Sequence, residues 1–284
     1  MAYCYKNRHL KKEMERMLWQ RRLATPCEMK MQRVNITMEQ QQFRTFRQSI
    51  VNLSESDQAV TLHGFEILNR PFLGTEFSSV EEFYSFSASH GRSRALDVYT
   101  INLGLKRFRD AAFADNFQWK QALVFVNIHL STLFSDEWQD LMARLPLPLS
   151  SVVLELAERE GLDTYSDRDV GLMMRDLQEA GIKVAVDDVG MGYSGLHTLA
   201  MVHPDYVKID RQLVFNIDHD PYRQHMMRSL VEYWAREGVS TIAEGIEREQ
   251  EAAFFTEIGT TFGQGYWFHK PEPVAVGFHA VGAK

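Results

Sequence analysis

Residues 167–190 read DRDVGLMMRDLQEAGIKVAVDDVG, and this stretch contains one helix–strand unit. A helical pattern covers residues 167–180, and Gly181 stands where that helix should stop, because glycine readily adopts the left-handed conformation that follows many helices. The apolar run at 182–186 comes next and predicts a buried strand. Asp187 and Asp188 directly follow this strand.

The same alternation of apolar runs and helical patterns continues on both sides of this unit. Further strands are predicted near 50–53 and at 62–68, 122–128, 151–156, 206–209, 240–243 and 264–268, and further helical segments at 80–113, 222–237 and 248–258. Such alternation is typical of parallel strands joined by crossover helices. About eight strands favour a closed (β/α)₈ TIM-like barrel over an open sheet.

The length of 284 residues and the apolar content of 45% allow one barrel with a sizeable core and an extension. We expect an N-terminal helical extension at 1–45, the barrel at 46–275 and a C-terminal tail at 276–284. Residues 1–33 hold nine Lys or Arg against three Glu, a net +6. Their apolar residues lie on one helical face, and Thr25 with Pro26 should end that helix. The apolar face belongs to Leu10, Met14, Met17 and Leu18.

Several properties limit the partners and the location of the chain. The extension can pack on the barrel, stay solvated, or bind a protein partner or a second copy in a homodimer. The net charge of −7 argues against a nucleic-acid polymer as partner. Cys4 and Cys27 have no metal-binding spacing, which indicates a reducing, cytoplasmic location. No apolar run approaches the roughly 20 residues that span a bilayer, so we expect no transmembrane segment.

Polar residues stand at the ends of the predicted strands. The carboxyl ends of all parallel strands in a barrel meet at one face, so these side chains should gather at one mouth. A single carboxylate after a strand commonly caps a helix, but five that converge would repel one another strongly unless cations were bound. The residues are Glu66, Asn127, Glu155, Asp187, Asp188, Lys208 and Glu244, and Gln264 opens the last run.

Oxygen ligands without cysteine or a histidine triplet favour Mg²⁺ or Mn²⁺. Adjacent aspartates suit a two-metal site, in which the ions activate a water and hold the attacking and leaving oxygens of a phosphate ester in line. Lys208 would orient that water or bind a phosphate oxygen. Arg70 is either a phosphate-binding fork or an ordinary surface arginine.

These segments resemble, in order from about residue 46 to 275, the EAL family of cyclic di-GMP phosphodiesterases. Ile67 and Ser49 depart from the family pattern, as do Val189, Met191 and Gly195 in the double-aspartate loop, which in the family couples dimerisation to metal binding. The matching segments are GFEILNR at 64–70, VNI at 126–128, LELAE at 154–158, VDDVGMGYS at 186–194, VKID at 207–210, AEGIE at 243–247 and QGY at 264–266 with Pro271; Gln48 and Ile50 match the family's opening strand.

The resemblance implies hydrolysis of cyclic di-GMP to linear pGpG with two ions of Mg²⁺ or Mn²⁺. One ion would be held by Glu66, Asn127, Glu155 and Asp187, and the other by Asp187, Asp188 and Glu244. Lys208 would contact the attacking water, and either Glu244 or Lys208 would be the base. Glu158 would anchor the loop after Asp188, Glu247 would complete the site, and the residues near the ligand would be Gln48, Leu68, Arg70, Tyr193 and Gln264.

Two other functions are compatible with parts of the pattern. The first is a catalytically weak or silent EAL domain that acts as a cyclic di-GMP receptor or as a protein-interaction scaffold. The second, a phosphotriesterase-like hydrolase on the same barrel, would need histidine ligands that the pattern lacks. His63, His129 and His203 match no family ligand, and we interpret each as an ordinary hydrogen-bonded histidine.

Overall fold

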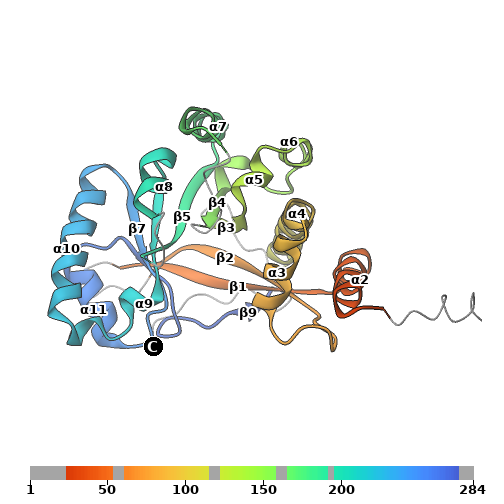
Figure 1. Cartoon of the computed structure of the whole chain (residues 1–284). Coiled ribbons are helices and arrows are strands. Elements are labelled where there is room, and N and C mark those ends of the chain that lie inside the picture. Colours follow the sequence, from red (N-terminus) through yellow and green to blue (C-terminus); the bar gives the residue numbers. More distant parts are fainter. Residues whose placement is uncertain (1–23, 54–60, 115–121, 158–164, 191–194, 275–284) are drawn as a thin grey trace, which may run out of the picture.

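A nine-stranded sheet closes into a barrel in the computed structural model, which describes residues 24–53, 61–114, 122–157, 165–190 and 195–274 (Figure 1). The strand order is β2-β3-β4-β5-β6-β7-β8-β1-β9, and a further β1–β2 pairing closes the ring, which confirms the predicted barrel. The strands are β1 (Phe43–Asn52), β2 (Leu62–Pro71), β3 (Leu123–Ile128), β4 (Val152–Ala157), β5 (Lys183–Val189), β6 (Tyr206–Ile209), β7 (Ser240–Ala243), β8 (Phe262–Gly263) and β9 (Glu272–Pro273).

The first strand departs from the expected all-parallel arrangement. β1 begins at Phe43 and runs antiparallel to both β2 and β8, whereas neighbouring strands from β2 to β8 are parallel. The connection at residues 53–61 is short, and a parallel return would need a crossover of about a dozen residues or more. The last strand also differs, because β8 ends at Gly263. Gln264 therefore follows this strand and does not open it.

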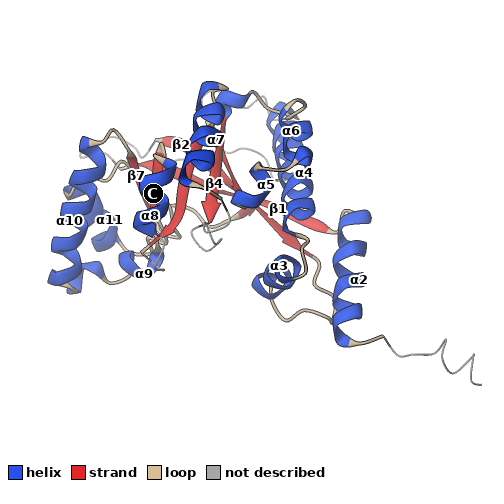
Figure 2. Ribbon diagram, turned by 45° about the horizontal axis from the view of Figure 1, so that its top comes forward, coloured by secondary structure: helices blue, strands red, loops and turns tan. Residues whose placement is uncertain are grey.

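Helices surround the barrel (Figure 2). The segment expected at 80–113 is two helices, which separate near Gly91, where φ is +69°. Short 3₁₀ turns cover Leu149–Ser151 and Ile217–His219. The helices are α2 (Pro26–Glu39), α3 (Val80–Ser89), α4 (Ser93–Ala114), α5 (Leu130–Leu133), α6 (Asp136–Met142), α7 (Asp167–Glu179), α8 (Gly195–Val202), α9 (Arg211–Val214), α10 (Pro221–Arg236) and α11 (Glu249–Glu257).

Thr25 and Pro26 begin the helix α2. The Thr25 hydroxyl accepts a hydrogen bond from the Glu28 backbone N–H, the Glu28 carboxylate accepts one from the Thr25 backbone, and Pro26 occupies the first turn of α2. The expected helix around Leu10–Leu18 lies outside the described residues. An ion pair between Arg33 and Glu76 (3.0 Å) fastens α2 to the segment before α3.

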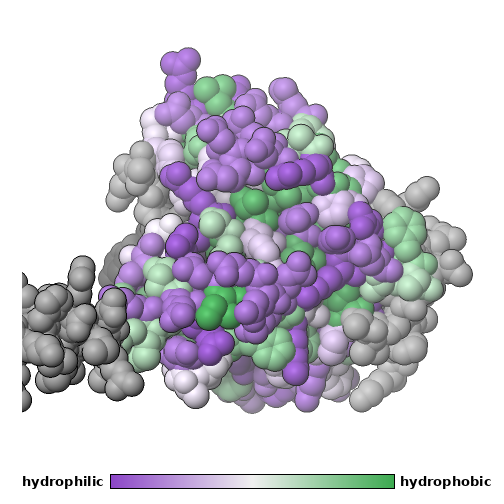
Figure 3. All heavy atoms as spheres, turned by 90° about the vertical axis from the view of Figure 1, so that its right-hand side faces the viewer, coloured by the Kyte–Doolittle hydropathy of each residue, from purple (hydrophilic) through white to green (hydrophobic). Residues whose placement is uncertain are grey.

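The side of the molecule that carries α2, α3 and α4 is largely hydrophilic at its surface, with hydrophobic side chains in small patches (Figure 3). Beneath it, Val34 of α2 packs in a buried cluster with Phe43, Phe83 and Leu96. In the part of the chain that the structure describes, no helix has the length and apolar character needed to cross a bilayer.

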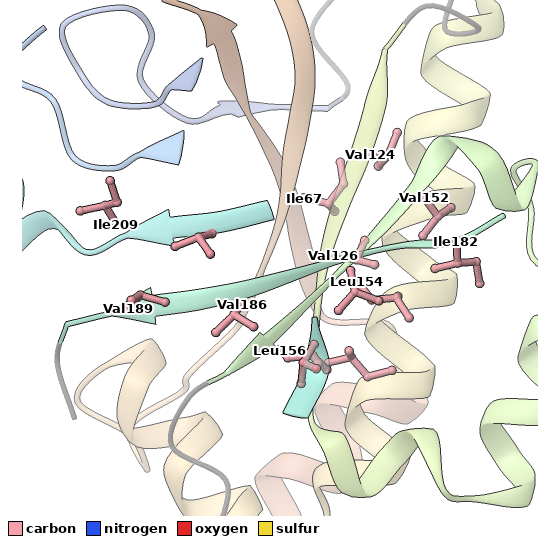
Figure 4. Close-up of a cluster of buried hydrophobic side chains, with 14 of the residues drawn as sticks. Ile67, Val124, Val126, Val152, Leu154, Leu156, Ile182, Val186, Val189 and Ile209 are labelled. Atoms are coloured by element: carbon pink, nitrogen blue, oxygen red, sulfur yellow. The ribbon is translucent and has the colours of Figure 1, made fainter. Parts of the chain in front are cut away.

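Two apolar layers fill the body because side chains alternate along each strand. The larger cluster lies between strands and helices and includes Val126, Leu154 and Val186, which Figure 4 shows on neighbouring strands. Val189 belongs to it and is 7% exposed. The smaller cluster contains Phe125 and Val153, whose side chains alternate with those of the larger cluster and so fill the barrel interior.

Candidate active site

On five neighbouring parallel strands, an apolar residue faces the barrel interior, and a polar residue follows it two positions later, within the strand or directly after its end. The apolar residues are Phe125, Val153, Ala185, Tyr206 and Ile242. Residues two apart on a strand face the same side, so the next inward-facing positions form a polar layer toward the carboxyl ends of the strands. This layer contains Asn127, Glu155, Asp187, Lys208 and Glu244, and Glu66 joins it from β2.

Lys208 lies at the centre of this polar layer and is 1% exposed. Its Nζ is 2.6 Å from Glu155 Oε1 and 2.7 Å from Glu244 Oε1. It is also 3.2 Å from Asp187 Oδ1 and 3.8 Å from Glu66 Oε2. Burial lowers the pKa of the ammonium, but the four surrounding carboxylates outweigh this effect and raise the pKa well above its ordinary value. Lys208 is therefore a fixed positive charge, and one such charge does not balance four carboxylates.

The excess of negative charge affects two of the carboxyl groups. Burial, with repulsion from Glu66 and Asp187, raises the pKa of Glu155 well above its usual range against the opposing effect of Lys208. Burial likewise raises the pKa of Glu244 to about 8, with Asp187 and Glu66 adding to the shift and Lys208 opposing it. Bound cations would remove the repulsion that these shifts report.

Two buried oxygens of the site also favour a bound cation. Glu155 Oε2 and Gln264 Oε1 have no hydrogen-bond partner among the described residues. A buried polar atom without a partner is costly and calls for an explanation, and coordination of a cation or a ligand would supply one. The oxygen-only donor set and its unsatisfied atoms therefore fit hard divalent cations.

Asp187, Asp188 and Glu244 each offer one oxygen, and these atoms lie within 4.8 Å of one another. Consecutive residues of a regular strand point to opposite faces, so Asp187 and Asp188 could not normally share a site. Here the register of β5 against β6 shifts between Val186 and Val189, and Asp188 has a φ of +53°. This irregularity brings both aspartates to the same cluster, at the cost of a backbone conformation that is uncommon outside glycine.

Amide side chains hold Glu66 in place. Asn127 Nδ2 donates to Glu66 Oε1 (3.2 Å), and Gln264 Nε2 donates to Glu66 Oε2 (2.6 Å). Gln264 Nε2 also lies 3.3 Å from Gln48 Oε1, and Gln48 Nε2 donates to the His269 carbonyl (3.1 Å). The antiparallel β1 places Gln48 beside Glu66 in register, which brings a residue from the first strand into the mouth.

The remaining predicted residues lie at the rim or outside the described residues. Arg70 is exposed, with its guanidinium 5.9 Å from the centre of the Phe46 ring, and it lines a cavity that Leu68 also lines. Glu247 is not part of the polar layer: it is exposed and pairs with Arg211 (2.8 Å). Glu158 and Tyr193 lie outside the described residues, as does Met191 of the double-aspartate loop.

Two buried acids near the site were not predicted from the sequence. Glu251 accepts hydrogen bonds from the backbone N–H groups of Glu247 and Arg248 and so holds the turn after β7. Asp97 of α4 accepts hydrogen bonds from His129, directly beyond β3. Neither acid follows a strand, so the rule that located the other residues did not point to them.

The EAL domain family model matches residues 31–271, from within α2 to the loop before β9. The chain belongs to the EAL domain family. This chain is 31% identical over 233 residues to the "Probable cyclic di-GMP phosphodiesterase PdeG" of Escherichia coli. The alignment covers 80% of this chain and 44% of PdeG. The chain thus spans less than half of that relative.

Solved structures share the fold of this EAL domain. The "EAL Enzyme Bd1971" in its cAMP- and cyclic-di-GMP-bound form aligns with a TM-score of 0.75 at 24% identity, over 96% of this chain and 73% of its own. Klebsiella pneumoniae BlrP1, as a calcium/cy-diGMP complex, has a TM-score of 0.69 at 26% identity, over 84% and 58% of the two chains. The names of these relatives describe cyclic di-GMP phosphodiesterases, and the cluster of Asp187, Asp188 and Glu244 in this chain could hold a metal ion.

Proposed function

We propose that this EAL domain hydrolyses cyclic di-GMP to linear pGpG with two Mg²⁺ or Mn²⁺ ions. The observation that carries the proposal is the enclosed Lys208 ammonium, in contact range of carboxylates on β2, β4 and β5 and of Glu244, directly after β7. A phosphodiester is an anion, and a site this acidic accepts it only if cations are bound as well. The activity named for PdeG and the ligand in BlrP1 support the same substrate.

The ligands of the two ions come from this polar layer. Glu66, Asn127, Glu155 and Asp187 would hold one ion, and Asp187, Asp188 and Glu244 the other. Bound ions would supply an activated water and neutralise charge that develops on the phosphate. Glu155 and Glu244, whose carboxyl groups carry raised pKa values, would ionise fully once the cations were in place.

Lys208 is assigned to orientation and charge stabilisation. Without bound metal, the surrounding carboxylates raise the pKa of Lys208 well above its ordinary value, and the ammonium donates hydrogen bonds to them. Either Glu244 or Lys208 would receive the proton of the attacking water. The ammonium then faces the water or a phosphate oxygen as a fixed donor.

Residues at the mouth would bind the rest of the dinucleotide. Arg70 stands exposed at the end of β2, where its fork can meet a phosphate, and Leu68 offers an apolar contact beside it. Gln48 and Gln264 place amide groups next to Glu66. Tyr193, the anchoring role of Glu158, a role of Glu247 in the site, a homodimer and a partner bound through residues 1–45 stay predictions.

The decisive experiment incubates the purified chain with cyclic di-GMP and Mg²⁺ or Mn²⁺ and separates the products by chromatography. We expect metal-dependent formation of pGpG, with none in EDTA. Glu66→Ala serves as the inactive reference, and Glu257→Ala, an exposed substitution on α11, serves as the control. Binding of cyclic di-GMP without any pGpG in either metal would refute hydrolysis and favour the receptor function.

A further inference from the structure

The antiparallel pair of β1 and β2 continues outward beyond the polar layer. β2 pairs with β3 only up to Glu66, whereas its pairing with β1 runs on to Pro71, toward α3 and α2 (Figure 1). Directly opposite residues, and residues two apart on one strand, share a face of the sheet. One face of the pair therefore starts in the polar layer and leads away from the barrel. Its opposite residues are Gln48 and Glu66, then Phe46 and Leu68, then Arg44 and Arg70.

Arg44 and Arg70 are like charges placed directly opposite each other. Both are exposed, and such a pair on neighbouring strands destabilises a sheet. The Arg44 guanidinium lies 5.1 Å from the centre of the Phe72 ring, on the side away from the barrel. The Arg70 guanidinium lies 5.9 Å from the centre of the Phe46 ring, on the side toward the barrel. The two cations thus lean apart along the face, which reduces their repulsion.

No carboxylate among the described residues compensates these two charges. Neither guanidinium has an ion pair or a hydrogen bond in that part of the chain. Exposed arginines elsewhere on the surface, such as Arg211 and Arg228, pair with a carboxylate. The chain carries a net charge of −7, so acidic partners are plentiful. Two uncompensated guanidinium groups beside the barrel mouth therefore fit an anion that comes from outside the chain.

We propose that Arg44 and Arg70 together bind the phosphodiester of cyclic di-GMP that is not cleaved. The inference rests on the proposed function and deepens it, because it adds Arg44 to the residues that bind the substrate. An anion between the two planar forks would remove their repulsion and accept hydrogen bonds from both. The result is a two-arginine clamp, made of Arg44 and Arg70.

The place of the clamp suits the second phosphate of a cyclic dinucleotide. The phosphate under attack would be neutralised by the proposed metal ions, whereas the other one needs positive charge from the protein. Both arginines stand four residues beyond Glu66 or Gln48, about 13 Å along the strands, and their long side chains can shorten that distance. The exposed rings of Phe46 and Phe72 hold the guanidinium planes without competing for their N–H groups.

Binding of cyclic di-GMP, measured by calorimetry in Ca²⁺, tests the clamp. Arg44→Gln keeps the stem of the side chain and removes the charge. We expect about tenfold weaker binding, near the lower end for a hydrogen bond between charged groups, because the clamp is open to solvent. Arg44→Lys keeps the charge without the fork and should lose less. The gap between the native chain and Arg44→Gln should shrink as salt rises from about 0.05 M to about 0.5 M.

Arg228→Ala is the matched control. The Arg228 guanidinium is exposed and lies 5.2 Å from the centre of the Phe254 ring, much as Arg44 lies over Phe72, but Arg228 stands on α10 and pairs with Glu257. It should bind cyclic di-GMP like the native chain. In hydrolysis with Mn²⁺, Arg44→Gln should show the loss in KM, with kcat close to the native value, because the cleaved phosphate stays with the ions.

Thermal melts without ligand distinguish a binding role of Arg44 from a structural one. Arg44→Gln removes one of two opposed charges, so its Tm should equal or exceed that of the native chain although it binds more weakly. A residue that only held β1 against β2 would lose stability on substitution. A Tm clearly below the native value, or a loss of affinity that salt leaves unchanged, would overturn the clamp.

The outcomes separate this inference from the proposed function. Native binding and hydrolysis together with undiminished binding by Arg44→Gln would overturn the clamp and leave hydrolysis intact. Weaker binding by Arg44→Gln in a chain that binds cyclic di-GMP without cleaving it would support the clamp and refute hydrolysis. Failure of the native chain to bind cyclic di-GMP in either Ca²⁺ or Mn²⁺ would overturn both.

Discussion

Lys208 Nζ lies 2.6 Å from Glu155 Oε1, and both side chains are enclosed by the barrel. Removing Lys208 would leave the carboxylates around it without their shared cation, whereas removing Glu155 would still leave Lys208 beside Glu66, Asp187 and Glu244. A barrel designed only for stability would fill these positions with apolar residues. The buried charges therefore lower the stability of the barrel, which indicates that the polar layer is kept for a function.

Glu66→Ala should reduce turnover by at least about 100-fold, the loss typical of removing a catalytic group. The carboxylate is buried, and both of its oxygens accept hydrogen bonds, from Asn127 and Gln264, which fix its position. The measurement is the rate of pGpG formation at saturating Mn²⁺, with Glu257→Ala as control. A variant that keeps more than about a tenth of the native rate would contradict the assignment of Glu66.

Lys208→Ala should lower turnover much more than affinity for cyclic di-GMP. The ammonium acts on charge that develops in the transition state, and such an interaction contributes to rate and little to ground-state binding. Rates and dissociation constants are measured on the same preparation, with circular dichroism to establish that the variant is folded. Equal losses in both quantities would reduce Lys208 to a phosphate clamp.

The stability of the metal-free protein should fall as the pH rises. Glu244 has a folded-state pKa of about 8, above the value near 4.5 expected for the unfolded chain. A raised pKa means that the folded state binds the proton more tightly, so this stabilisation is present below pH 4.5 and is lost progressively as the pH rises toward 8. Thermal melts in EDTA between pH 6.5 and 9 measure the effect, above the range in which His63, whose pKa burial lowers to about 4, has the opposite dependence on pH. Mn²⁺ should flatten the dependence, and a Tm that rises with pH in EDTA would contradict the charge balance proposed for this site.

Ca²⁺ should permit binding of cyclic di-GMP and suppress its hydrolysis. Calcium takes oxygen ligands at about 2.3–2.6 Å with loose geometry, whereas Mg²⁺ demands an octahedron at about 2.0–2.1 Å. Calorimetry and product analysis in each metal, at equal ligand concentration, compare the two activities. Hydrolysis in Ca²⁺ alone at a rate near that in Mn²⁺ would count against strict positioning by two ions.

Two truncated chains should distinguish the contribution of α2 to stability from that of the residues before it. Deleting residues 1–40 removes Val34, which is fully buried against Phe43 and Phe83, and loses about 2 kcal/mol or more of apolar burial. Deleting residues 1–23 keeps Thr25 and the capping box and should melt at a clearly higher temperature. The comparison is the Tm of the two truncated chains. Equal values would show that α2 adds nothing to the stability of the barrel.

Much of the fold follows from local pattern. The strands at Tyr206–Ile209 and Ser240–Ala243 have the bounds that their apolar runs predict, because a short buried strand is defined by the residues it buries. The gathering of Glu155 and Lys208 also follows from the sequence, since parallel strands in a barrel end at one face. Apolar runs do not encode strand direction, however, so the antiparallel course of β1 was not predicted.

Finer features of the site depended on tertiary structure. Asp187 and Asp188 share one cluster only because β5 shifts register against β6, and that irregularity has no signature in the alternation of apolar residues. Asp97 and His129 meet across 32 positions because α4 packs over the end of β3, although neither position stands out in its own segment. The sequence alone indicated that Asn127, Glu155, Asp187, Lys208 and Glu244 reach the barrel mouth, since that depends on periodicity along each strand. Only the tertiary structure decided which of them touch, because contacts between distant segments depend on packing that no local pattern specifies.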